Sequence, residues 1–211
     1  MPNYVTDLSN ARRWDQPVVR IYVESTGAAT EAQVSAARAG FELWRASVTG
    51  APALEYTSDP AAANLTVAIK PAAEIPNGHI GATQVFFRVP ENVLVRGTIL
   101  LSESLSQATM KQVAAHEMGH ALGLDGHSAT DSDLMYPISH TPAQVTVRDR
   151  NSMDLNYVAP ATRPDAAPST LLGILPAEGR ASRAASTVVS KEYAILGDGQ
   201  GGGACGAPAV P

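Results

Sequence analysis

Three of the chain's five histidines, His116, His120 and His127, lie within twelve residues, in the stretch HEMGHALGLDGHS. On an α-helix, residues four apart lie on one face about one turn distant, so His116 and His120 can present imidazole nitrogens to a single ion. A catalytic zinc site uses three protein ligands and keeps one position open, so a third donor must come from outside that face. The chain must therefore form a helix here and then turn back toward it.

The helix and its turn are both predicted from the neighbouring residues. The stretch TMKQVAAHEMGHALG supplies apolar residues at helical spacing, with Thr109 and Gln112 expected as a capping box. Gly123 follows at once and can adopt the positive φ that turns the chain back. The next donors are Asp125 and His127. Neutral imidazole is the more usual third donor, which favours His127 and leaves Asp125 as its rival.

Glu117 directly follows the first histidine of the pair. It lies about 100° round the helix, where its carboxylate can reach a water at the metal without binding the metal itself. The pattern HExxH also arises by chance in helices that bind nothing. Here it falls inside a predicted helix and is followed by a glycine stop and a third histidine. Together these features favour a metal site with Glu117 as the general base.

The remaining periodicity predicts an α+β fold. A long amphipathic helix is expected to begin at Thr30, with Gln33 as its capping-box partner, and to stop at Gly50. Another helix is expected from about Thr146 to Tyr157. Alternation of apolar residues predicts strands at 18–23, 64–70, 82–87 and 97–102.

Composition limits the possible partners. The chain has 211 residues, 45% of them apolar, and a net charge of −5 without a basic run, so neither nucleic acid nor a membrane is expected to bind. Its apolar stretches are too short to span a bilayer, and the N-terminal residues lack the apolar core of a signal peptide. Residues 159–211 are rich in Ala, Pro, Gly and Ser, which predicts a flexible C-terminal tail after a domain at 1–158.

HEMGHALGLDGHS, followed by DLMYP at residues 133–137, resembles the metzincin metalloproteases and, within them, the matrixins, the family of the matrix metalloproteinases. His116, Glu117, His120 and Gly123 match the family pattern HExxHxxGxxH, and Met135 matches its methionine turn. The departure is one extra residue, because the family pattern would place its third histidine at position 126. His127 is aligned with it through its spacing to the methionine turn, and Gly126 is interpreted as the residue that lets the loop bulge.

The resemblance implies a zincin-like metzincin domain with a mixed, twisted, five-stranded sheet, three helices, and an active-site helix followed by a methionine turn. It further implies a zinc-dependent endopeptidase in which His116, His120 and His127 hold one Zn²⁺ ion and Glu117 is the general base. A protein or peptide substrate would lie antiparallel to an exposed strand near Gly81 to Val85. Residues 137–141 would line a side-chain pocket. The terminal helix resembles that of matrixins, with Asp149 and Tyr157 in matching places.

Several alternatives stay open at this stage. Asp149 is also placed to cap its own helix from Thr146. The site could bind zinc without turnover, or the chain could be a histidine-rich metal hydrolase acting on RNA, although that family lacks a glutamate after the first histidine. Cys205, in ACGAPA, shares the order Cys-Gly-x-Pro with the inhibitory segment of matrixin precursors, which suggests intramolecular inhibition by the tail. Secretion is expected from family likeness, and a monomer is the default expectation.

Overall fold

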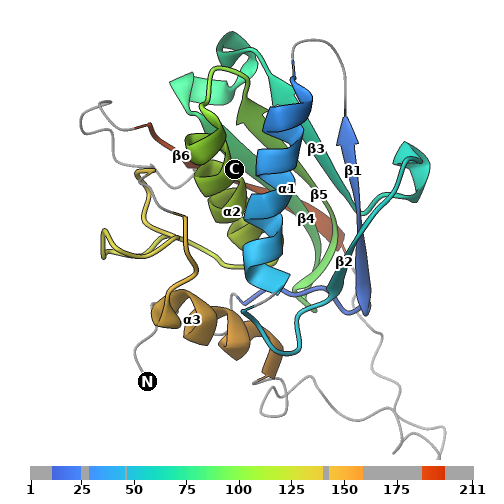
Figure 1. Cartoon of the computed structure of the whole chain (residues 1–211). Helices are drawn as coiled ribbons and strands as arrows, with labels where there is room; N and C mark the ends of the chain where they lie inside the picture. The colour runs from blue at the N-terminus through green and yellow to red at the C-terminus, as the bar shows by residue number, and fades with distance from the viewer. Residues whose placement is uncertain (1–10, 25–28, 46, 140–142, 159–186, 198–211) are drawn as a thin grey trace, which may run out of the picture.

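The computed structural model describes residues 11–24, 29–45, 47–139, 143–158 and 187–197. Two long helices lie side by side across one face of a mixed sheet, and the third helix lies beyond their ends (Figure 1). The helices are α1 (Glu31–Arg45), α2 (Gln107–Ala121) and α3 (Val147–Val158). The strands are β1 (Val18–Glu24), β2 (Ala53–Tyr56), β3 (Leu65–Lys70), β4 (Gly81–Val89), β5 (Val93–Ser102) and β6 (Thr187–Ile195). No helix in these ranges is both long and apolar enough to cross a bilayer.

The sheet has six strands in the order β2-β1-β3-β5-β4-β6, so the predicted α+β class is correct and the predicted count of five is not. β1, β2, β3 and β5 run parallel, whereas β4 is antiparallel to β5 and to β6. The four strands predicted from alternation are β1, β3, β4 and β5. β2 escapes prediction because it is short and buries only Leu54, which leaves no alternation to detect.

β6 corrects the prediction of a flexible tail over residues 159–211. Residues Thr187–Ile195 pair with the whole of β4, from Gly81 opposite Ile195 to Val89 opposite Thr187. The strand expected to be an exposed edge near Gly81 to Val85 is therefore covered. Only Tyr193 and Ile195 of β6 are fully buried. The sequence TVVSKEYAI accordingly lacks a sustained apolar alternation, which is the pattern that predicts a strand. The rest of the predicted tail, including Cys205, lies outside the described residues.

α1 forms as the sequence predicts, although it ends earlier. Thr30 and Gln33 make the capping box: the Gln33 N–H donates to Thr30 Oγ1 at 3.2 Å, and the Thr30 N–H donates to Gln33 Oε1 at 3.0 Å. The apolar face buries Phe41 and Trp44. The Trp44 indole N–H then donates to the Ala115 carbonyl at 2.7 Å, which joins α1 to the middle of α2.

The N-cap of α2 lies three residues before the predicted cap, Thr109. Ser106 is the N-cap, and its side chain accepts from the Thr109 N–H, so the predicted box of Thr109 with Gln112 is wrong. From Met110 to Ala121 every residue except Lys111 is buried. A helix enclosed on nearly all sides belongs to the core. Its histidines are therefore held by rigid packing on both faces.

The C-terminal end of α2 is pinned by three side chains from distant segments. The Trp14 indole N–H donates to the Ala121 carbonyl at 2.9 Å, and the Tyr157 hydroxyl donates to the Leu122 carbonyl at 2.7 Å. The Asn156 amide donates to the Gly123 carbonyl at 2.9 Å. These bonds satisfy carbonyls that a helix end leaves without partners. They also fix the point from which the chain turns toward His127.

Candidate metal centre

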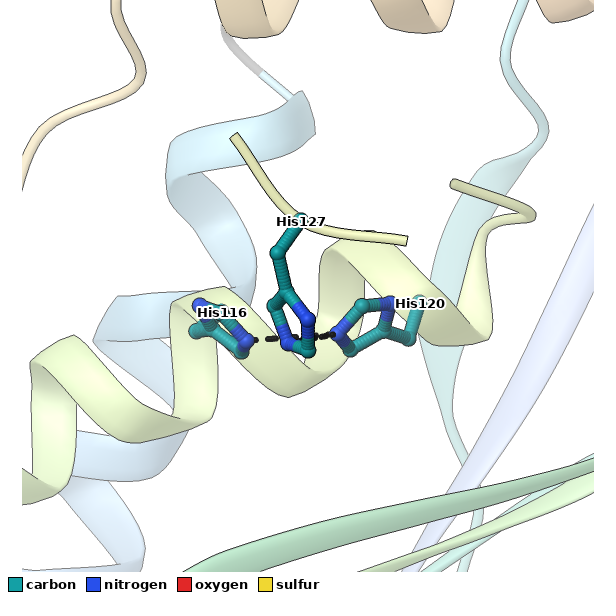
Figure 2. Close-up of side chains that lie close together, drawn as sticks. All are labelled: His116, His120 and His127. Atoms are coloured by element: carbon teal, nitrogen blue, oxygen red, sulfur yellow. Dashed lines mark hydrogen bonds between the residues drawn. The ribbon is translucent and has the colours of Figure 1, made fainter. Parts of the chain in front are cut away.

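The three histidines predicted from the sequence converge. His116 and His120 project from successive turns of α2, and His127 reaches over them from the following loop (Figure 2). The Nε2 atom of His120 lies 3.2 Å from that of His116 and 3.3 Å from that of His127. One ligand atom from each residue lies within 4.8 Å of the other two. Tetrahedral ligand atoms about 2.0–2.1 Å from zinc are about 3.3 Å apart, so the donors fit that ion.

Backbone carbonyls orient the two helical histidines. His116 Nδ1 lies 2.8 Å from the Leu134 oxygen, and His120 Nδ1 lies 2.9 Å from the Leu124 oxygen. A carbonyl oxygen only accepts, so each Nδ1 carries the hydrogen and each neutral ring turns an Nε2 lone pair inward. Lone pairs that face each other repel unless a cation lies between them. The protein has therefore prepared the donor tautomers that a metal requires.

Burial favours the neutral form of His120 and His127. It lowers the pKa of His120 well below the usual value, and the neighbouring His116 and His127 lower it further. Burial also lowers the pKa of His127 to about 4. Metal ions bind the neutral imidazole, so a low pKa removes competition from protons at neutral pH.

Two glycines carry the chain from α2 to His127. Gly123 has a φ of 111° and Gly126 a φ of 91°, values that side chains with a Cβ rarely adopt. The predicted turn at Gly123 is confirmed. The positive φ at Gly126 agrees with its interpretation as the residue that accommodates the extra position.

Asp125, the rival third ligand, is engaged elsewhere. Its Oδ2 lies 2.9 Å from an Arg12 guanidinium nitrogen, and its Oδ1 lies 2.5 Å from Lys191 Nζ. The Tyr193 hydroxyl also donates to Oδ1 at 3.0 Å. Burial alone would raise the pKa of Asp125, but the bond from Lys191 and the charge of Arg12 outweigh it, and the pKa is lowered. The carboxylate that could have replaced His127 is thus satisfied by cations and a hydroxyl.

Glu117 follows His116 in the sequence and is fully buried. Its Oε2 accepts a hydrogen bond of 2.6 Å from the Thr83 hydroxyl on β4, whereas Oε1 has no partner among the described residues. Burial raises the pKa of Glu117 to about 8, against a smaller lowering by Thr83. A cation held by the neighbouring histidines would oppose this rise and favour the ionised form, which can accept a proton.

The methionine turn packs directly beneath the histidines. Met135 is fully buried, and a Cβ added to Gly119 would lie 2.4 Å from its sulfur. The turn is thus pressed against the helical segment between His116 and His120. The contact places an apolar side chain against the helix that carries the two histidines.

Asp149 has the capping role that the sequence left open and a second role that the sequence did not predict. It caps α3, because its Oδ2 accepts from the Thr146 N–H at 2.8 Å and the Thr146 hydroxyl at 2.7 Å. It also holds the methionine turn, because Oδ2 accepts from the Leu134 N–H at 2.9 Å and Oδ1 from the Met135 N–H at 3.3 Å. Since the Leu134 carbonyl orients His116, Asp149 positions a candidate metal ligand through one intervening peptide.

Sequence reasoning missed several residues around the site. Thr83, Arg12 and Tyr193 come from segments far from the motif, and nothing local marks them. Asp133 lies inside the quoted DLMYP stretch, but its partners could not be foreseen. It is buried and accepts from the Ser128 hydroxyl at 2.5 Å and from Arg148 Nε at 2.9 Å, and it shares the one hydrogen of the Thr146 hydroxyl, 2.8 Å away, with Asp149. Asp133 thus joins the loop after His127 to the start of α3.

Asp133→Asn should lower the free energy of unfolding by about 2 kcal/mol at pH 7, because hydrogen bonds to a charged group are strong. Burial alone would raise the pKa of Asp133, but the bonds from Ser128, Arg148 and Thr146 outweigh it and lower the pKa. A lowered folded-state pKa stabilises the protein above the unfolded value, and that stability is lost as pH falls through the folded value.

The difference between wild type and Asp133→Asn should therefore shrink as the pH falls from about 5 to 3. Urea unfolding of both proteins, with a chelator present so that metal release does not contribute, measures it. A difference that stays constant over this pH range would show that the charge of Asp133 is not responsible.

The converging histidines, the adjacent glutamate and the methionine turn, on a mixed sheet with three helices, are consistent with the metal centre that the resemblance to metzincins implies. The family model described as Matrixin matches residues 98–158, which contain α2, the histidine loop, the methionine turn and α3. Over this segment the chain is similar to the matrixins, and the match together with the three histidines supports a zinc metalloprotease family. The matched segment is less than a third of the chain. No curated protein matches the chain significantly.

Proposed function

We propose that this chain is a zinc-dependent endopeptidase that hydrolyses peptide bonds in protein substrates. The observation that carries the proposal is the convergence of three imidazoles beside a buried glutamate, one of whose carboxylate oxygens has no hydrogen-bond partner among the described residues. Three nitrogen ligands leave a fourth position of zinc open, as catalytic rather than structural sites do. Matrixins normally bind zinc, and the matched segment contains all three donors.

His116, His120 and His127 would hold the ion, which when bound supplies a Lewis acid that activates water and polarises a peptide carbonyl. Glu117 takes a proton from the attacking water at its free Oε1 and delivers it to the departing amine. Thr83 keeps the other oxygen in place, so the carboxylate does not have to reorient between the two steps. Burial excludes bulk water and makes the proton exchange specific to the bound substrate.

Glu117→Gln should reduce peptidase activity at least about a hundredfold, because the amide cannot accept the proton and general-base catalysis contributes about 10²–10⁴. Zinc content should stay near that of the wild type, because Glu117 supplies no ligand. Elemental analysis and hydrolysis of denatured casein measure the two properties.

Glu55→Gln is the matched control, because Glu55 is exposed on β2, which is the edge strand at the end of the sheet opposite β4 and β6. Equal activity in Glu117→Gln and wild type would refute the role of the glutamate. If Glu117→Gln lost its zinc while wild type and Glu55→Gln kept theirs, Glu117 would instead be part of the metal site.

A further inference from the structure

The edge of the sheet next to the metal centre is covered by the chain's own C-terminal region. β6 runs antiparallel along β4 from Thr187 to Ile195. β4 also carries Thr83, which holds Glu117, so the strand that β6 covers is the wall of the proposed active site. An extended segment that adds a strand to a sheet edge is a common form of peptide binding, in which main-chain hydrogen bonds supply affinity.

The same segment is also held from the other side. Beyond β6, the Leu196 N–H donates to the Pro137 carbonyl, and the Ser139 N–H donates to the Leu196 carbonyl, both at 3.1 Å. The Ile80 N–H donates to the Ile195 carbonyl at 3.1 Å. Residues 195 and 196 are therefore clamped between the start of β4 and the residues that follow the methionine turn. An ordinary edge strand makes main-chain hydrogen bonds on one side only, whereas these two residues make them on both sides, as a peptide bound in a groove does.

β6 also contacts one of the three histidines through Tyr193. The Tyr193 ring stacks on that of His120, with centroids 4.3 Å apart and planes 5° from parallel. The Tyr193 oxygen accepts from Arg12 and donates to Asp125, and Lys191 pairs with the same carboxylate. β6 is thus anchored by a ring stack and an ionic network that both adjoin the metal centre.

The fully buried side chains of β6 are confined to this end. Tyr193 and Ile195 are buried, whereas Thr187 and Ser190 are exposed and Val188 is 52% exposed. A permanent strand of a core sheet would bury one face along its whole length. Here the burial is concentrated where a substrate would have to enter.

We propose that residues 187–196 occupy the substrate groove and keep the full chain latent, so that a protein substrate must displace this segment to reach the metal. The proposal rests on the proposed function for its consequence, although the occupancy can be tested separately. It also indicates what the groove accepts: an extended peptide with an aromatic residue two positions before a buried aliphatic one, as in Tyr193 and Ile195. Opening the groove must raise activity, because only the open fraction of molecules binds substrate.

The test compares full-length wild type, Tyr193→Ala, Lys191→Ala and Ser190→Ala. Tyr193→Ala removes the stack and both hydroxyl bonds, and Lys191→Ala removes one ion pair at the half-buried rim, which limits the risk of misfolding. Ser190 is exposed on the same strand and is the matched control. Each protein is assayed for casein hydrolysis, zinc content and binding of a fluorescent peptide TVVSKEYAIL by anisotropy.

We expect Tyr193→Ala to bind the peptide and to hydrolyse casein about tenfold faster than wild type, with a smaller rise for Lys191→Ala and none for Ser190→Ala. Peptide binding without any casein hydrolysis in these zinc-loaded variants would support the occupancy and refute the endopeptidase. Folded, zinc-loaded Tyr193→Ala and Lys191→Ala that neither bind the peptide nor gain activity would overturn the inference and make β6 a permanent strand.

Discussion

Gly123→Ala is expected to lower the free energy of unfolding by about 3–5 kcal/mol, the combined cost of a left-handed backbone and of overpacking. Gly123 has a φ of 111°, and an added Cβ would lie 2.0 Å from the Arg12 carbonyl oxygen. Backbone atoms cannot rotate aside as a side chain can. The segment before Trp14 would have to move, and its bond to the end of α2 would be weakened.

Gly126→Ala is the matched control for this prediction. Gly126 also has a positive φ, of 91°, but a Cβ there would meet nothing within 4 Å. It should cost only the backbone strain, about 1–2 kcal/mol. Urea unfolding of both variants separates strain from collision. If the two variants lost equal stability, the close approach of Arg12 to Gly123 would be unimportant.

Asp149→Ala should cost about 3–5 kcal/mol, because it leaves several buried donors without a charged acceptor. The Leu134 and Met135 N–H groups and the Thr146 cap all depend on this carboxylate. Zinc affinity should also fall about 10–100-fold, since the Leu134 carbonyl that orients His116 would no longer be fixed.

Denaturation and competition with a zinc chelator measure the two effects of Asp149→Ala. Asp131→Ala is the control, because Asp131 is an exposed aspartate in the same loop region. Asp149→Asn keeps one acceptor oxygen, so its losses of stability and zinc affinity should lie between those of Asp149→Ala and Asp131→Ala. Weakened stability with unchanged zinc affinity would show that Asp149 serves as a helix cap alone and does not position His116.

The local part of the site was predictable because it depends on short spacing. Two histidines four apart on a helix must share a face, and Gly123 at the helix end permits the turn that follows. The first capping box followed from Thr30 and Gln33 alone, since both bonds lie within one turn. The second was misplaced because Ser106 precedes Thr109 as an equally good cap, and spacing alone does not rank the two.

The amino-acid sequence thus specified the helix that carries His116 and His120, its stop, the candidate donors and the candidate base, all through interactions between near neighbours. It left the third ligand between Asp125 and His127, and it left Asp149 between a cap of its own helix and a position matching the matrixin terminal helix. Both questions depend on partners more than ten residues away, such as Arg12 for the first and Leu134 for the second. β6 is the extreme case, because its pairing with β4 spans about a hundred residues and depends on main-chain bonds, which any sequence can make.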